Sequence, residues 1–270
     1  MAETIYLRLA SGDWHLATYL LIFAIGASIG SFLNVCIYRI PESKSIVSPP
    51  SSCPSCNSSI KFYDNIPIIS YLLLFGRCRN CKANISIQYP IVEAITGIFA
   101  ILTIYYFGFL INSLIYFLFI ASLIVITFID LRHQIIPDVI SIPGIIIGLA
   151  SSFFLHNITL MNSMLGILAG GGSLFLVAYV YQVITGRDGM GGGDIKLIAM
   201  VGAFLGWKAA IITIFAGSFI GSVIGIIAMV LQKKDTKYAI PFGPFLALGA
   251  VIYIFFGETL IKFWLTNTYS

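Results

Sequence analysis

The chain has 270 residues, of which 59% are hydrophobic and only 10% are charged, and its formal net charge is +4. An ordinary soluble domain is about 25% charged and about 45–50% apolar. A mean hydropathy of +0.97 therefore excludes a soluble enzyme, a disordered protein and a nucleic-acid-binding domain, since each of these needs a more polar composition. The composition predicts an all-α polytopic membrane protein embedded in a lipid bilayer.

A helix needs about 20 mainly apolar residues to cross a bilayer. Long apolar stretches predict spans at residues 16–37, 90–110, 111–130, 138–156, 160–184, 208–231 and 242–264. The shorter stretch Ile195–Trp207 follows a glycine cluster and is either a further span or a re-entrant segment. With this stretch crossing, about eight transmembrane helices are expected. The run Gly170–Gly172 inside the fifth span indicates either close helix packing or a weak point in that helix.

The basic residues favour one orientation, because Lys and Arg concentrate on the cytoplasmic side of membrane proteins. If residues 38–89 are cytoplasmic and Ile195–Trp207 crosses, only Arg8, Lys208 and Lys262 lie outside. The basic residues that then lie inside are Arg39, Lys44, Lys61, Arg77, Arg79, Lys82, Arg132, Arg187, Lys196, Lys233, Lys234 and Lys237. We therefore expect residues 38–89 to face the cytoplasm.

This threading divides the chain into three predicted parts. Residues 1–37 form a first transmembrane segment, residues 38–89 a cytoplasmic insertion, and residues 90–270 a transmembrane core. The insertion contains an apolar stretch, Ile66–Phe75, that is too short to cross the bilayer. This stretch is expected to be a buried or interfacial helix.

Four of the five cysteines form two C-x2-C pairs inside the insertion, Cys53 with Cys56 and Cys78 with Cys81. Two such pairs about twenty residues apart can close a tetrahedral thiolate site around one zinc ion. Disulfides are rare on the reducing side of the membrane, where the threading puts this segment. The spacing predicts a structural zinc site, with redox thiols as the alternative. Four thiolates leave no open position for a substrate.

Two of the eleven acidic residues lie at the predicted cytoplasmic edge of an apolar helix. Asp130 ends the apolar run Ile124–Ile129, and Asp194 follows Gly191–Gly193 and begins the next apolar stretch. Ionisable groups at this depth are costly and indicate a functional site. If the two carboxylates meet, one keeps its proton, and the pair then offers an acid and a base for peptide hydrolysis.

Other interpretations of these acids remain open at the level of residues. Asp194 can instead be a helix N-cap, and Asp130 can be an interfacial anchor paired with Arg132 or Lys196. A proton- or ion-coupled transporter is an alternative function, because intramembrane acids and glycine-broken helices also mark transport paths. A zinc-stabilised scaffold without chemistry is a third.

Further polar residues are candidates for supporting roles. Asp138 follows a proline and is expected to cap the next helix. Glu93 lies just inside the second span, where it either supports the site or lies at the interface. Lys196 lies two residues after Asp194 and either tunes its charge or extends toward the interface. Gly191 and Gly193 remove Cβ atoms where a substrate backbone would approach.

Several motifs resemble one known family. Gly191-Gly192-Gly193-Asp194 followed by Ile195-Lys196-Leu197 resembles the G-x-G-D motif of intramembrane aspartyl proteases, and more narrowly that of bacterial type IV prepilin peptidases. Further agreement comes from Gly30–Val35 with Arg39–Pro41, from the two C-x2-C pairs, from Ile85–Glu93, and from Phe128–Asp130 with Ile135–Asp138. These motifs run in order through most of the chain.

The resemblance implies a bifunctional enzyme of the bacterial cytoplasmic membrane. Such enzymes cut the basic leader from type IV prepilins or type II secretion pseudopilins, and then methylate the new N-terminal amine with S-adenosylmethionine. Asp130 and Asp194 match the family's catalytic aspartates, and the four cysteines match its tetracysteine module. No dinucleotide-type glycine motif marks a methyl-donor site, so Gly76 and the Ser86–Glu93 segment are where methyl transfer is expected.

Overall fold

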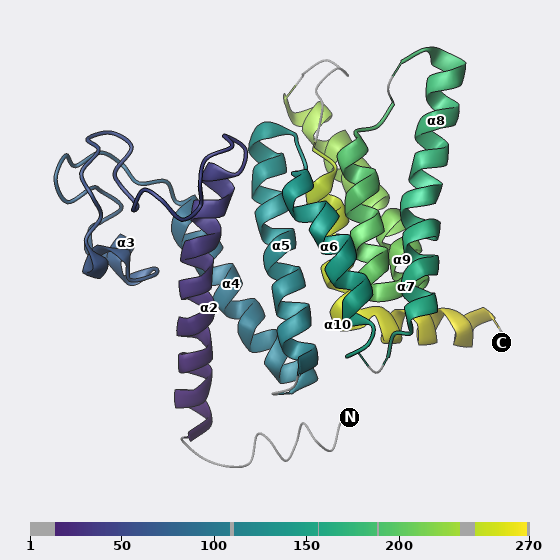
Figure 1. The fold of residues 1–270 in the computed structure, drawn as a ribbon, viewed down its shortest axis with the longest axis horizontal. Coiled ribbons are helices and arrows are strands. Elements are labelled where there is room, and N and C mark those ends of the chain that lie inside the picture. Colours follow the sequence, from purple (N-terminus) through teal and green to yellow (C-terminus); the bar gives the residue numbers. More distant parts are fainter. Residues whose placement is uncertain (1–13, 109–110, 156, 188, 233–240, 269–270) are drawn as a thin grey trace. The chain divides into compact units, whose positions relative to one another are not determined.

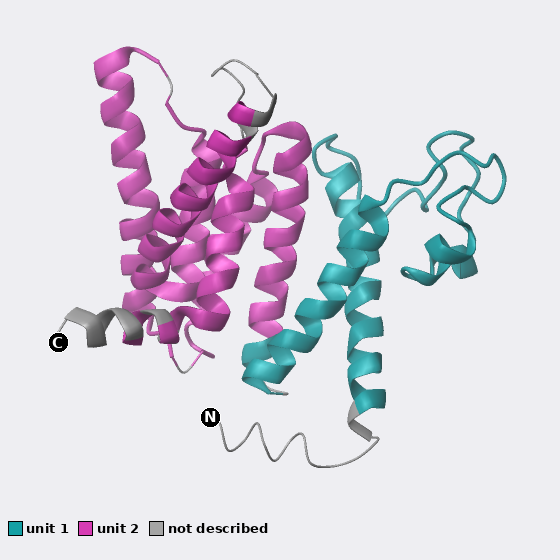
Figure 2. Cartoon of the chain, turned by 180° about the vertical axis from the view of Figure 1, so that it is seen from behind, with its two compact units in different colours: residues 1–113 teal, residues 114–270 magenta. Residues whose placement is uncertain are grey.

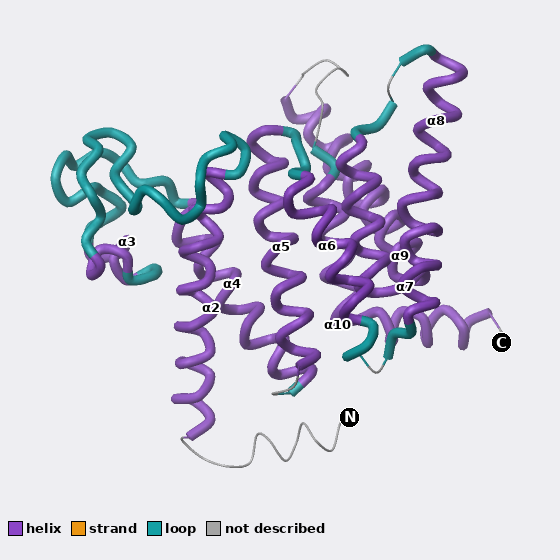
Figure 3. The backbone as a smooth tube through the Cα atoms, in the orientation of Figure 1, coloured by secondary structure: helices purple, strands orange, loops and turns teal. Residues whose placement is uncertain are grey.

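The structure is a computed structural model that describes residues 14–108, 111–155, 157–187, 189–232 and 241–268. Within these residues every regular element is a helix and there is no strand (Figure 3). The expected all-α fold is confirmed. The chain divides into two compact units, residues 1–113 and residues 114–270, which Figure 2 shows in different colours.

The first unit contains two long helices that pack along each other, α2 (Trp14–Arg39) and α4 (Gln88–Phe107) (Figure 1). Small residues permit this close approach, since a Cβ atom on Gly26 would lie 2.6 Å from the Cβ of Ala100. Between the two helices, residues 40–87 form the insertion. It carries the short helices η1 (Phe62–Asn65) and α3 (Ile69–Leu73).

The second unit is organised around its longest helix, α9, which contacts several neighbouring helices. Its helices are α5 (Ile111–His133, which begins in the last residues of the first unit), α6 (Asp138–Ser151), α7 (Leu160–Ile167), the π-helical turn η2 (Leu168–Gly172), α8 (Ser173–Thr185), α9 (Gly192–Gln232) and α10 (Gly243–Thr268). Phe204 of α9 stacks on Phe119 of α5 with their ring centroids 4.4 Å apart.

Glycines explain how α6, α7 and η2 approach α9. A Cβ atom on Gly148 would lie 2.7 Å from the Cβ of Ala203, and one on Gly166 would collide with the backbone of Gly202. Gly170 packs in the same way against Ile198. The run Gly170–Gly172 therefore combines both expected properties, because it packs closely and also departs from α-helical geometry as a π-helical turn.

Gly206 interrupts α9 with φ 82° and ψ 176°, a conformation that glycine adopts without strain. The interruption separates the two predicted segments Ile195–Trp207 and 208–231 into consecutive helical pieces. Helix α6 ends at Ser151, earlier than the predicted 138–156, because residues 152–154 form a tight turn with bonds such as that from the N–H of Phe153 to the oxygen of Ala150.

Among the described residues, five helical stretches are long and apolar enough to cross a membrane by themselves. They are Leu16–Arg39, Gln88–Phe107, Ile111–His133, Leu160–Thr185 and Gly192–Ile227. The apolar helices Asp138–Ser151 and Gly243–Gly257 are shorter. The protein is a multi-pass membrane protein. Arg8, Lys233, Lys234 and Lys237, which contributed to the orientation argument, lie outside the described residues.

Candidate active site and metal-binding insertion

Asp130 lies in the last turn of α5 and is 5% exposed. Its carboxylate oxygen Oδ2 accepts a hydrogen bond of 2.9 Å from the backbone N–H of Gly243, the first residue of α10. The first N–H groups of a helix have no partner within that helix and favour a negative charge. The start of α10 therefore both orients this carboxylate and interacts favourably with its ionised form.

Asp194 is the third residue of α9 and is half-buried. Its carboxylate interacts electrostatically with that of Asp130. The side chain of Ile136 lies between the backbone next to Asp194 and the residue that binds Asp130. A Cβ atom on Gly193 would lie 2.8 Å from the Cβ of Ile136, and a Cβ atom on Gly243 would lie 3.3 Å from its Cδ1. The fold thus brings together two acids that are 64 residues apart in the sequence.

The ammonium of Lys196 binds Asp138, with Nζ 2.7 and 2.8 Å from the two carboxylate oxygens. This ion pair joins the first turn of α6 to the first turns of α9. The expectation that Asp138 caps α6 is wrong, because Pro137 occupies the N-cap position and no side chain caps the helix. The described ion pair of Lys196 is with Asp138 and not with Asp130 or Asp194.

The three glycines before Asp194 differ in how much space surrounds them. A Cβ atom on Gly193 would lie 2.8 Å from Ile136, whereas one on Gly192 would meet nothing within 4 Å. At Gly191 the nearest atom is Oδ2 of Asp194, at 3.7 Å, an ordinary contact. Of the three, Gly193 is the one for which the packing excludes a side chain.

Gly243 is a site residue that the sequence analysis did not identify. It is buried, and a Cβ atom there would lie 2.7 Å from Oδ2 of Asp130. The sequence does contain a signal for it, since Pro241-Phe242-Gly243-Pro244 places a proline-flanked glycine where the last apolar span begins.

In the insertion, the two C-x2-C pairs form loops with the same backbone pattern. The N–H of Cys53 bonds to the oxygen of Ser58, and the N–H of Cys78 bonds to the oxygen of Ala83. In each loop the residue after the second cysteine, Asn57 or Lys82, has a positive φ. Each loop is therefore a tight turn that presents both of its sulfur atoms toward the same point.

The four sulfur atoms of Cys53, Cys56, Cys78 and Cys81 lie within 4.8 Å of one another, and those of Cys53 and Cys81 are 3.8 Å apart. A tetrahedral zinc–thiolate site with bonds of about 2.3 Å would separate its sulfurs by about 3.8 Å. A hydrogen bond from Ser58 lowers the pKa of Cys56 to about 6, and thiolates are the form that binds metal. The cluster can hold a metal ion.

Glu93 and Gly76 lie in the first unit. The carboxylate of Glu93 is buried and accepts a hydrogen bond of 2.7 Å from the N–H of Ile68 in the insertion. It also interacts with the hydroxyl of Ser31 in α2. Gly76 has φ +64° beside Tyr71, and its oxygen accepts a bond of 2.7 Å from the N–H of Ile85. Both residues therefore hold the insertion in shape.

These features define a multi-pass membrane protein with two interacting carboxylates at helix ends and a four-cysteine insertion. Residues 24–107 match the family described as the bacterial peptidase A24 N-terminal domain, and residues 117–226 match the type IV leader peptidase family. The chain belongs to the type IV leader peptidase family.

Three relatives named "Prepilin leader peptidase/N-methyltransferase" illustrate the similarity. The protein from Pseudomonas aeruginosa is 33% identical and the alignment covers 93% of this chain and 94% of the relative. The protein from Neisseria gonorrhoeae is 37% identical, with 90% and 93% covered, and that from Legionella pneumophila is 33% identical, with 92% and 94% covered. No solved structure matches the chain. The alternative of a transporter finds no support in these relationships.

Proposed function

We propose that this protein cleaves the basic leader peptide from type IV prepilins or pseudopilins with Asp130 and Asp194, and then methylates the new N-terminal amine. The observation that carries the proposal is geometric: Gly243, which donates to Asp130, and Gly193, which precedes Asp194, both pack against Ile136, so the two carboxylates lie in one place at helix ends of the second unit. Membership of the leader peptidase family and the names of the relatives support the substrate and both reactions.

In the proposed cleavage, the ionised carboxylate takes a proton from a water molecule while the protonated one donates a hydrogen bond to the scissile carbonyl. The water oxygen adds to the carbonyl carbon, and the carbonyl oxygen receives the partner's proton. Collapse of this tetrahedral species breaks the C–N bond and delivers a proton to the leaving amine. The products are a carboxylic acid on the leader and a free amine on the pilin.

The different surroundings of the two acids support different roles for them. Asp130 is buried and receives the N–H of Gly243, which favours its ionised form. Asp194 is half-buried beside the glycines that precede it and is the more accessible to a substrate backbone. We therefore assign the single shared proton to Asp194 in the resting state, with Asp130 as the base. Gly191 leaves space beside Asp194, and Gly193 lets Ile136 pack closely before this acid. The Lys196–Asp138 pair positions the start of α9.

The proposed location is the bacterial cytoplasmic membrane, with the active site facing the cytoplasm. The distribution of Lys and Arg supports this orientation. A prepilin is an apolar helix with a basic leader, so its helix can lie in the bilayer beside the membrane-spanning helices while the leader stays in the cytoplasm. No nucleic acid takes part.

For the second reaction we propose S-adenosylmethionine as the methyl donor, and the N-methyltransferase names of the relatives support this choice. When bound, this cofactor supplies the methyl group that the new amine accepts. The proposed region includes Gly76 and Glu93. Because the Glu93 carboxylate is already bonded to the backbone of Ile68, we assign it a positioning role.

We propose zinc as the metal of the four cysteines. The 3.8 Å separation of the Cys53 and Cys81 sulfurs supports a tetrahedral thiolate site. Such an ion would supply a structural cross-link between the two loops, which have little hydrophobic core of their own.

The proposal is tested with purified protein in detergent and a prepilin substrate, by comparing the wild type with Asp130→Asn and Asp194→Asn. Cleavage is expected for the wild type alone, while both variants keep the wild-type helical content. Cleavage by either variant at the wild-type rate would disprove the two-aspartate mechanism. A parallel assay follows the labelled methyl group of S-adenosylmethionine, and no incorporation into cleaved pilin would disprove the second activity.

A further inference from the structure

The insertion exposes a group of large apolar side chains around α3. Phe62, Leu72, Leu73 and Phe75 are 64–89% exposed, and Ile69 is 53% exposed. We name these five residues the α3 patch. Ile69, Leu72 and Leu73 follow the spacing of one face of α3, and the described residues leave this apolar face uncovered. Phe62 lies in η1, and Phe75 lies two residues after the end of α3. The expected alternatives for this stretch were a buried or an interfacial helix, and its exposure excludes burial within the described part of the chain.

The position of α3 puts this patch at the depth of the membrane surface. The N–H of Ile68, which immediately precedes α3, binds the carboxylate of Glu93 at 2.7 Å. Glu93 is the sixth residue of α4, so it lies about 7.5 Å along that helix from Gln88. Because α4 is a candidate membrane span, α3 begins below the end of this span. Figures 1 and 2 show α3 beside α2, lower than the end from which the insertion leaves.

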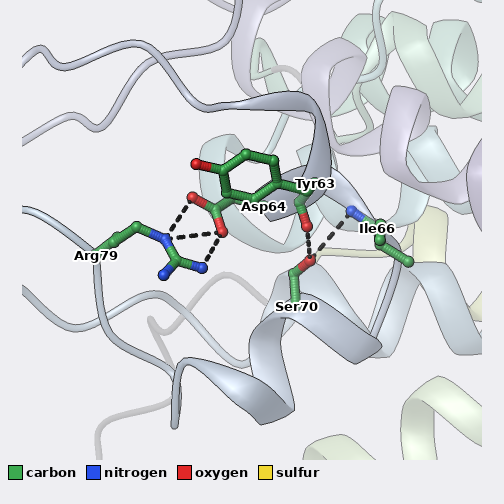
Figure 4. A network of polar contacts seen from close by, with 5 residues as sticks. All are labelled: Tyr63, Asp64, Ile66, Ser70 and Arg79. Atoms are coloured by element: carbon green, nitrogen blue, oxygen red, sulfur yellow. Dashed lines mark hydrogen bonds and ion pairs between the residues drawn. The ribbon is translucent and has the colours of Figure 1, made fainter.

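Polar contacts fix the patch to the rest of the insertion, as Figure 4 shows. The guanidinium of Arg79 binds both carboxylate oxygens of Asp64 in η1, at 2.6–3.1 Å, and lowers the pKa of Asp64 through these bonds. The Ser70 hydroxyl donates to the oxygen of Tyr63 and accepts from the N–H of Ile66. Arg79 lies between Cys78 and Cys81, so the network joins η1 and α3 to the second cysteine loop.

The backbone conformation of Ile68 indicates that surrounding contacts hold the start of α3 in place. Ile68 has φ 61° and ψ −50°, a conformation that is unfavourable for a β-branched residue. The bond from its N–H to the buried carboxylate of Glu93 holds the chain in this turn immediately before α3. Strain of this kind persists only where surrounding contacts determine it.

The charge of the insertion is complementary to an anionic membrane surface. Residues 40–87 contain five basic and two acidic side chains, a formal net charge of +3, whereas the whole chain has a net charge of +4. Lys61 precedes Phe62, and Arg77 follows Phe75 by two residues. Apolar side chains flanked by basic ones are typical of segments that lie in the lipid headgroup region.

We propose that the α3 patch inserts into the headgroup region of the lipid bilayer, and that Glu93 sets the depth of this insertion. The patch thereby holds the four-cysteine insertion against the membrane surface. The occupant is lipid, because the patch is level with the first turns of α4 and its flanking charges match anionic headgroups. This inference does not depend on the proposed peptidase activity.

Tryptophan fluorescence in proteoliposomes tests the proposal. Trp14, Trp207 and Trp264 are replaced by Phe, and a single tryptophan is introduced by Phe75→Trp or, as a matched control, by Val47→Trp. Val47 is 86% exposed in the same insertion but lies outside the patch. Vesicles contain phosphatidylethanolamine and phosphatidylglycerol with bromine atoms at shallow or deep acyl positions, and iodide probes exposure to water.

Quenching of Phe75→Trp by shallow bromines is expected to exceed that of Val47→Trp about twofold, because interfacial helices bury their apolar face by about 5–10 Å. Iodide in the water phase should quench Val47→Trp more strongly than Phe75→Trp. In the same background, Glu93→Ala, which removes the acceptor of the Ile68 N–H, should reduce the bromine quenching of Phe75→Trp toward the control value. Equal bromine quenching at both positions would overturn the proposal. A tryptophan at position 75 shielded from iodide but not quenched by bromine would also overturn it, and would show that protein covers the patch.

Discussion

Gly243→Ala tests the aspartate pair without removing either carboxylate. The backbone N–H of this residue donates to Oδ2 of Asp130 at 2.9 Å. The added methyl carbon would stand 2.7 Å from that oxygen, whereas an ordinary contact begins at 3.4 Å. The carboxylate or the start of α10 must therefore move by about 0.7 Å.

The expected effect on activity is much larger than the effect on stability. Overpacking a well-packed site costs typically about 1–3 kcal/mol, which corresponds to a fall of a few degrees in the thermal unfolding midpoint. Misplacing a reacting group by about 1 Å can lower a rate by about 100-fold. We expect kcat/KM for prepilin cleavage to fall by about this factor while the protein remains folded.

Gly172→Ala is the matched control, because a Cβ atom there meets nothing within 4 Å. This variant should cleave prepilin at the wild-type rate. The measurement is an initial rate of leader release in detergent, with circular dichroism to verify helical content. A Gly243→Ala enzyme with wild-type kcat/KM would refute the assignment of Asp130 as a positioned catalytic group.

The remaining predictions concern the glycine motif and the insertion. Gly193→Ala should lower the cleavage rate through contact with Ile136, whereas Gly192→Ala should not, and equal rates would contradict this packing argument. Cys78→Ser should remove the metal measured by mass spectrometry, whereas Cys36→Ala, in the α2 span, should retain it; unchanged metal content in both would rule out the cysteine site. Because its arginine partner lowers the pKa of Asp64, the pair stabilises the insertion at neutral pH, and this stabilisation is lost as the pH falls through the lowered pKa. The difference in thermal stability between the wild type and Asp64→Asn should therefore be present at pH 7 and shrink below about pH 4; a gap that is independent of pH would contradict this.

The helices and the cysteine site could be predicted from sequence because their causes are local. A long apolar run must be helical in a bilayer, since only a helix satisfies its backbone hydrogen bonds within one segment. Two cysteines separated by two residues lie in one tight turn, so the spacing of the pairs already defines four converging ligands. The predicted boundary between Ile195–Trp207 and residues 208–231 falls one residue after Gly206, where α9 is interrupted at a residue that permits a positive φ.

The pairing of side chains from distant helices depended on the tertiary structure. Nothing in the local sequence shows that Asp130 and Asp194 lie close enough to interact electrostatically, that Lys196 binds Asp138, or that Gly243 donates to a carboxylate 113 residues away. In a bilayer every apolar helix makes its backbone hydrogen bonds within itself. Its sequence therefore determines that it crosses the membrane but only weakly determines which helices it packs against. That choice depends on the close packing of small residues such as Gly166 and Gly202, whose match appears only when two helices are placed together.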